Sequence, residues 1–132
     1  MMVTFKEQHT FAQRQIEALR IRDKFPSRIP VIVERSPQSR HIPSIDKSKF
    51  LVPGDLTVGQ FVYIIRKRVS LPPEVALFLF VNGTLPTTTT LMRELYTSLA
   101  DNDGFLYCLY SGENVFGGGC SLHSPPPYPL LV

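Results

Sequence analysis

The 132-residue sequence has few cysteines and no long apolar run. Its two cysteines, Cys108 and Cys120, are too few for a disulfide framework and fit a reducing compartment. No apolar run approaches the ~18 residues that a membrane-spanning helix needs, and the N-terminus lacks the apolar core of a secretory signal. We therefore expect neither an integral membrane protein nor a secreted one, but a single domain that buries its own core.

The sequence also lacks the residue patterns of metal centres and of common active sites. It has no H-E-x-x-H, P-loop or G-x-S-x-G motif. Gly117–Gly119 does not open a helix and so is no phosphate-binding loop. Cys108 lies within an apolar run, which predicts a buried structural thiol rather than a nucleophile. The histidines are scattered without the spacing of metal ligands: His9, His41 and His123. We therefore predict that the protein is not an enzyme.

Acidic side chains are scarce in the first half of the chain. Residues 1–68 hold thirteen of the fourteen lysines and arginines but only six of the eleven acidic residues. This asymmetry favours acidic partners or anionic membrane on one side, the alternative being a solvated basic helix and loop. No aromatic platform or zinc finger accompanies the basic run 66–68, so nucleic acid is not an expected partner. The residues assigned to the basic surface are Arg14, Arg20, Arg22, Lys24 and Arg28.

Apolar periodicity and turn-forming residues predict an α+β fold. Helices are expected over 1–24, over 57–69 and in a short segment capped by Thr90, and strands over 28–35, 49–52, 77–81 and 105–110. Pro30 cannot donate to a ladder and favours the start of a strand or an edge. Strand 77–81 is apolar on both faces, which predicts a central position. The order is typical of a ubiquitin-like β-grasp, a four-stranded mixed sheet with packed helices, preceded here by an N-terminal helical extension.

A short strand with alternating side chains is a candidate peptide-docking edge. Lys49 and Leu51 alternate with Phe50 and Val52. Backbone hydrogen bonds at such an edge give affinity for an extended peptide, and apolar pockets for alternate side chains give specificity. The alternative is that these side chains are ordinary core residues. Lys49 is the exception, since a lysine among apolar strand residues needs an acidic partner or solvent.

Five segments resemble the autophagy-related ubiquitin-like modifiers, the family that contains the GABA-receptor-associated protein and the microtubule-associated-protein light chain. The resemblance runs in order over nearly all of residues 5–117. It departs at Gly54, where family members usually carry a larger residue, and in the long tail beyond Gly117. The segments are KEQHTFAQRQIEALRIRDKF (6–25), KFPSRIPVIVER (24–35), DKSKFLVPGDLTVGQFVYIIRKR (46–68), LFLFVNGTLPTTTTLMRELY (77–96) and DGFLYCLYSGENVFG (103–117).

The resemblance implies a modifier whose chemistry is carried out by its partners. Family members are cleaved after a glycine by a cysteine protease, activated by an E1-like enzyme, passed to an E2-like enzyme and joined to phosphatidylethanolamine. On the autophagosome membrane they recruit receptors and adaptors that carry an aromatic-x-x-aliphatic motif. We therefore expect a cytoplasmic protein that is membrane-bound when lipidated, with covalent phosphatidylethanolamine and no other cofactor or metal.

The resemblance also implies two peptide-binding pockets. The residues that match the deeper one, pocket 1, are Glu17, Ile21, Pro30, Ile32, Lys49, Leu51 and Phe105. The residues that match pocket 2 are Phe50, Val52, Pro53, Phe61, Ile64, Ile65 and Arg68.

The processing site is predicted between Gly117 and Gly118. Phe116 and Gly117 match the aromatic-glycine terminus of the family, in which the aromatic residue is recognised. Glycine also suits the site physically, because without a Cβ it threads a narrow protease groove and leaves its carbonyl open to attack. The alternatives are cleavage after Gly118 or Gly119, a tail without purpose, and lipid attachment at Cys120.

These boundaries divide the chain into four parts. They are a helical extension (1–24), a β-grasp core (25–111), a C-terminal arm (112–117) and a tail removed by processing (118–132). Three functions stay open: a lipid-conjugated modifier that docks receptors, a modifier attached to proteins, and an unconjugated β-grasp scaffold.

Overall fold

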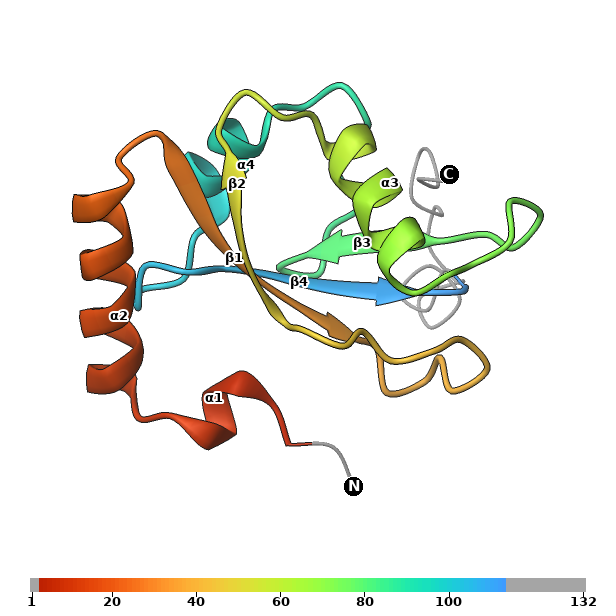
Figure 1. The fold of residues 1–132 in the computed structure, drawn as a ribbon, viewed down its shortest axis with the longest axis horizontal. Coiled ribbons are helices and arrows are strands. Elements are labelled where there is room, and N and C mark those ends of the chain that lie inside the picture. The colour runs from red at the N-terminus through yellow and green to blue at the C-terminus, as the bar shows by residue number, and fades with distance from the viewer. Residues whose placement is uncertain (1–2, 114–132) are drawn as a thin grey trace.

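The computed structural model describes residues 3–113, in which a four-stranded sheet carries helices on both faces (Figure 1). The helices are α1 (Phe5–Gln8), α2 (Phe11–Lys24), α3 (Val58–Arg68) and α4 (Met92–Leu99). The strands are β1 (Arg28–Arg35), β2 (Lys49–Pro53), β3 (Phe78–Val81) and β4 (Leu106–Ser111). This element order and the mixed sheet confirm the predicted α+β β-grasp.

The sheet separates two apolar cores. Its strand order is β2-β1-β4-β3, with β1 antiparallel to β2 and parallel to β4, and β3 antiparallel to β4. Helices α3 and α4 cover one face, and α1 and α2 lie on the other (Figure 1). Because side chains alternate along a strand, Val31 and Val33 enter the larger core and Ile32 enters the smaller one. The smaller core is Phe5, Ala18, Ile32 and Phe105.

The predicted helix over 1–24 is wrong as a single element. The structure has two helices there, and His9 between them is extended. Each helix begins with its own capping box, Thr4 with Glu7 and Thr10 with Gln13. Since a capping box satisfies the free N–H groups of a new helix start, the second box at Thr10 marks a break rather than a continuation.

The cap predicted for the short helix is also wrong. Leu91 is the N-cap of α4, and its N–H donates to Glu94 Oε1 at 2.9 Å. The Thr90 hydroxyl instead bonds to that of Thr87, at 2.7 Å. The Glu94 side chain therefore caps the N–H of the N-cap residue. This half of a capping box does not require a hydroxyl on the N-cap residue itself. The apolar stripe predicted for the longer helix is buried, as expected: Val58, Phe61, Val62, Ile65 and Val69.

Strand β3 lies at an edge of the sheet, which contradicts the predicted central position. Its residues are buried although only β4 pairs with it. Leu79 and Val81 belong to the larger core, so helix packing rather than a second strand neighbour covers that face. Pro30 lies near the start of β1, as predicted, one residue before pairing with β4 begins at Val31.

Cys108 confirms the prediction of a buried structural thiol. Its side chain is 2% exposed in β4, and burial raises its pKa to about 12. Since the thiolate is the reactive form, this thiol is unreactive near neutral pH.

Candidate peptide-docking groove

The outer edge of β2 carries backbone groups that no strand of the sheet pairs. Strand order confirms that β2 is an edge. The Val33 N–H donates to Ser48 O at 2.7 Å, so these opposed residues form a hydrogen-bonded pair. In an antiparallel ladder, hydrogen-bonded pairs alternate with pairs that are not hydrogen-bonded. Lys49 and Leu51 belong to the pairs without hydrogen bonds, so their N–H and C=O groups point away from β1. Two residues of β2 are therefore placed to pair with an added strand.

The residues predicted for pocket 1 gather between α2 and the β2 edge. Leu51 lies opposite Pro30, and Lys49 lies opposite Ile32. Ile32 and Phe105 have no exposed surface and form the floor, whereas Leu51 is partly exposed. The seven residues come from α2, β1, β2 and the turn before β4: Glu17 and Ile21, Pro30 and Ile32, Lys49 and Leu51, and Phe105.

An ion pair joins the two walls of pocket 1. The Lys49 ammonium donates to Glu17 Oε2, and both side chains are partly exposed, at 40% and 32%. The acidic partner expected for Lys49 is thus found on α2. Because Lys49 is the cross-strand neighbour of Ile32, the pair spans from β2 to α2 on the face where Ile32 is buried.

Phe50 and Val52, predicted for pocket 2, lie on the opposite face of β2 and pack in the larger core with α3, which carries four more of the predicted residues. Pro53 is exposed at the end of β2, two positions after Leu51. The Phe50 ring packs edge-to-face on Phe61 with centroids 5.9 Å apart. Phe61 and Ile65 have no exposed surface, and Phe50 and Val52 are buried as well. All four belong to the larger core, so the core alternative holds for them. Ile64 is 38% exposed. The Arg68 guanidinium lies 5.8 Å from the Phe50 ring and donates through Nε to Asp46 Oδ1 at 3.0 Å.

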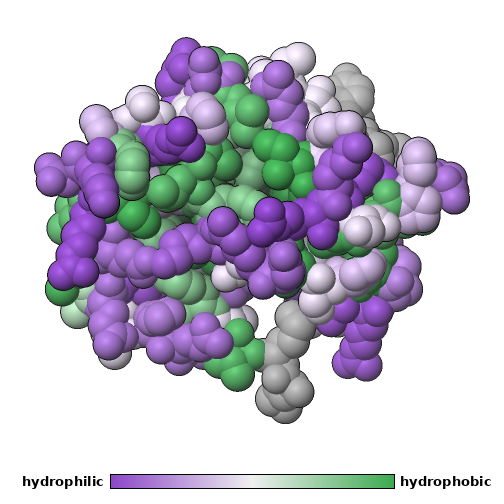
Figure 2. Space-filling view, viewed as in Figure 1, coloured by the Kyte–Doolittle hydropathy of each residue, from purple (hydrophilic) through white to green (hydrophobic). Residues whose placement is uncertain are grey.

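Figure 2 shows apolar surface gathered over β2, between α2 and α3, with hydrophilic side chains along its border. The exposed part of the groove is made of Leu51, Pro53 and Ile64 together with the two paired cations, Lys49 and Arg68. This arrangement provides an apolar surface with positive charge available at either side, which suits an extended peptide with an acidic flank.

A buried polar cluster that the sequence did not predict supports the floor of pocket 1. The Asp103 carboxylate accepts the Phe105 N–H at 2.8 Å and the Tyr107 hydroxyl at 2.5 Å. Arg14 Nη1 lies 3.4 Å from Asp103 Oδ2, and both side chains are buried. Burial first, and then the bond to Asp103, raise the pKa of Tyr107 above its ordinary value. The cluster fixes Phe105 against α2.

The cluster corrects the predicted basic surface. Arg14 is 9% exposed and paired, so it is not part of that surface. Arg20 and Arg28 are exposed, and Arg28 Nη1 lies 3.4 Å from Leu51 O at the β2 edge. Arg22 donates to Arg28 O at 2.9 Å and lies over the Tyr96 ring. The basic surface therefore begins at the C-terminal half of α2 and continues to the groove.

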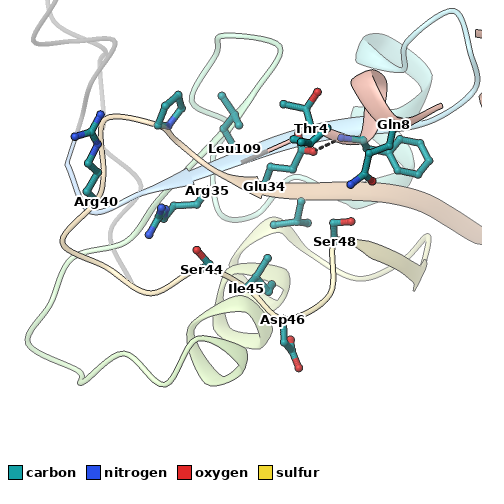
Figure 3. A pocket seen from close by; sticks show the side chains of 14 residues that line it. Thr4, Gln8, Glu34, Arg35, Arg40, Ser44, Ile45, Asp46, Ser48 and Leu109 are labelled. Atoms are coloured by element: carbon teal, nitrogen blue, oxygen red, sulfur yellow. Dashed lines mark hydrogen bonds between the residues drawn. The ribbon is translucent and has the colours of Figure 1, made fainter. Parts of the chain in front are cut away.

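A cavity of about 830 Å³ lies apart from both pockets (Figure 3). It is open to solvent and is lined by residues 3–8, the end of β1, Leu109 of β4 and the connector, which we define as residues 36–48. Glu34 at its wall accepts the Phe5 N–H at 2.7 Å. Its lining comes from segments far apart in the sequence and without shared periodicity, so sequence patterns give no signal for it.

Some predicted features fall outside the described residues. The processing residues Phe116 and Gly117 and the tail 118–132 are among them. Within residues 3–113, no group of three or more His, Cys, Asp or Glu side chains is placed to hold a metal ion. In the same residues no helix is both long enough and apolar enough to cross a membrane.

Comparison with known proteins identifies the family. The family described as "Autophagy protein Atg8 ubiquitin like" matches residues 13–117. The chain is 59% identical to Autophagy-related protein 8 of Saccharomyces cerevisiae over 117 residues, which cover 89% of the chain and 99% of that protein. It is 58% identical to Autophagy-related protein 8c of Arabidopsis thaliana over 114 residues, or 86% of the chain and 95% of that protein. The chain therefore belongs to the Atg8 family and is an autophagy-related ubiquitin-like modifier.

Proposed function

We propose that this chain is cleaved after Gly117, joined through that residue to phosphatidylethanolamine, and held on autophagosome membranes, where it docks receptor peptides along β2. The expected partners in conjugation are a processing cysteine protease, an E1-like enzyme and an E2-like enzyme. Before conjugation the chain is cytoplasmic, and no cofactor other than the covalent lipid is expected. Membership of the Atg8 family supports this proposal.

The observation that carries the docking proposal is that the two pockets lie on opposite faces of one edge strand. Leu51 points to the α2 face, whereas Phe50 and Val52 point to the α3 face. In an extended peptide, residues three apart also point to opposite faces. A peptide paired with β2 therefore places the aromatic and aliphatic residues of an aromatic-x-x-aliphatic motif in different pockets.

Charge supplies a second element of recognition. Lys49 and Arg68 flank the apolar groove and are paired with Glu17 and Asp46 at the protein surface. Exposed ion pairs of this kind contribute about 0–1 kcal/mol, so they exchange readily for a carboxylate on a bound peptide. We therefore assign the groove to peptides with an acidic residue beside the motif.

Two other functions share the fold. A modifier attached to proteins would use the same C-terminal glycine, and an unconjugated scaffold would use the groove alone. The family favours lipid conjugation over both. The three differ in the covalent state of the C-terminus, because only the first carries a lipid and only the third keeps the tail.

The test is a pair of glycine variants expressed in starved cells. Gly117→Ala is expected to block both removal of the tail and appearance of a lipid-bearing form. Gly119→Ala serves as the matched control, because it alters the tail two residues beyond the proposed bond. Normal maturation of Gly117→Ala, or loss of maturation only in Gly119→Ala, would contradict cleavage after Gly117.

A further inference from the structure

The connector holds the point at which the C-terminal arm leaves the fold. The Gly112 N–H donates to Ser39 Oγ at 2.7 Å, and Ser39 Oγ lies 2.8 Å from Ser111 Oγ. Ser111 Oγ in turn donates to Glu113 O at 2.6 Å and accepts the Glu113 N–H at 3.1 Å. Two serines that are 72 positions apart in the sequence therefore secure three successive residues at the end of β4.

The hydrogen-bond directions in this cluster are mutually consistent. Because the Ser111 proton goes to Glu113 O, the Ser39 proton is the one that joins the two hydroxyls. Each hydroxyl then donates once and also accepts from a backbone N–H. Both serines have no exposed surface, so water does not replace either partner without opening the connector.

Neighbouring contacts wrap the connector around the same exit point. The Ser36 N–H donates to Tyr110 O at 2.8 Å, and the Tyr110 hydroxyl donates to Pro43 O at 2.7 Å. Gly112 passes so close that a Cβ there would lie 2.5 Å from His41 Nε2. The Ser36 bond continues the β1–β4 ladder, and β3 pairs with the other side of Tyr110 and Ser111. The contacts of Pro43, Ser39 and His41 with the end of β4 go beyond strand pairing.

We propose that Ser39 and Ser111 form a clamp that sets the direction in which the arm leaves the fold and so presents Gly117 to the processing protease. Ser39 is a positioning residue in this proposal, which rests on the proposed cleavage after Gly117. Gly117 lies four positions beyond Glu113, a reach of at most about 14 Å, so the direction of the chain at Glu113 limits where the scissile bond can lie.

The clamp acts by reducing the freedom of the arm before the protease binds it. An arm with a fixed base loses less conformational entropy on binding than one whose base moves. Loss of the clamp is therefore expected to weaken binding of the arm while leaving the chemical step unchanged. In kinetic terms, KM rises and kcat stays constant.

The experiment measures cleavage of the full 132-residue chain by its processing protease over a range of chain concentrations. For Ser39→Ala we expect KM to rise about fivefold at constant kcat, the scale of fixing the backbone of one residue on binding. Ser39→Thr, which keeps the hydroxyl, is expected to restore much of the loss. Ser36→Ala is the matched control, because its hydroxyl donates to Gln38 and not to the arm. Unchanged peptide binding along β2 shows that each variant is folded.

A second measurement needs no enzyme. In wild-type protein the Gly112 amide proton is expected to exchange slowly with solvent, and in Ser39→Ala it is expected to exchange at least tenfold faster. Equal exchange, or an unchanged or lower KM for Ser39→Ala, would overturn the clamp. Normal cleavage of Gly117→Ala under the same conditions would instead overturn the proposed function, so the two failures are distinguishable.

Discussion

The ammonium group of Lys49 on β2 is bonded to the carboxylate of Glu17 on α2, and beneath this bond Ile32 has no exposed surface. On our proposal, a peptide that enters pocket 1 has to separate these two charges. Because the pair is partly exposed, its separation costs little, and the released Lys49 becomes available to an acidic residue of the peptide.

Neutralising Glu17 should strengthen binding of acidic-flanked peptides. Glu17→Gln releases Lys49 and removes a carboxylate that repels the peptide, so we expect Kd to fall about two- to fivefold by calorimetry. Lys49→Ala should raise Kd, and its effect should shrink at high salt. Asp23→Asn, an exposed change on the same helix, is the control. Weaker binding by Glu17→Gln would contradict a closing role for the pair.

Truncation of Leu51 should cost more than the loss of either charge. Leu51→Ala truncates a partly exposed apolar side chain at the β2 edge. We expect a loss of about 1–3 kcal/mol of binding free energy, the scale for burying one aliphatic side chain. The control is Leu19→Ala, since Leu19 is 64% exposed on α2 and outside both pockets. Equal affinities of the Leu51→Ala and wild-type proteins would show that peptides bind elsewhere.

The spacing of the peptide motif is a direct consequence of the two faces of β2. A peptide with aromatic and aliphatic residues three apart should bind, whereas shortening the spacing to two places both side chains on one face. We expect the shortened peptide to bind at least tenfold more weakly in a fluorescence competition assay. Comparable affinity for both spacings would mean that pairing with β2 does not determine recognition.

Breaking the buried cluster under pocket 1 should destabilise the whole fold. Asp103→Ala leaves Arg14 as a buried unpaired charge and the Tyr107 hydroxyl without its acceptor. We expect the free energy of unfolding to fall by about 3–5 kcal/mol in urea denaturation. Lys6→Ala breaks the more exposed pair with Asp101 and should cost under about 1 kcal/mol. Similar losses in both variants would argue against a stabilising role for burial.

Cys108 should make the fold sensitive to alkaline pH. Its pKa in the native state is about 12, against an ordinary value of 9.0, so the native state keeps a proton that the unfolded state releases. The stability from this thiol is complete below about pH 9 and falls by about 1.4 kcal/mol per pH unit above it. Between about pH 8 and about pH 10, wild type should therefore lose about 1.4 kcal/mol more than Cys108→Ala in urea denaturation. Equal losses of unfolding free energy in wild type and Cys108→Ala would contradict a raised pKa of Cys108.

Sequence patterns correctly predicted the elements whose buried face follows from the spacing of their own apolar residues. The alternation of Lys49 to Val52 correctly placed side chains on two faces of an edge strand, and the stripe on α3 correctly marked a core helix. The apolar run of β3 was misleading, because periodicity reports burial and not the identity of the neighbour that causes it. At Leu79 that neighbour is the helical layer.

Contacts between polar residues that are far apart in the sequence could not be predicted from local sequence patterns. Arg14 looked like a surface charge because its partner, Asp103, lies at the other end of the chain. The same holds for Ser39 and Ser111, which have no local feature that would join them before the fold brings them together. Glu17 and Lys49 were each singled out, but that they form an ion pair follows only from the packing of α2 beside β2.

The most direct test of the central claim is the intact mass of the protein recovered from starved cells, in soluble and membrane fractions. We predict a soluble form that ends at Gly117 and a membrane-bound form heavier by phosphatidylethanolamine less one water. A membrane-bound form that retains residues 118–132, or one linked to another protein instead of a lipid, would contradict the account.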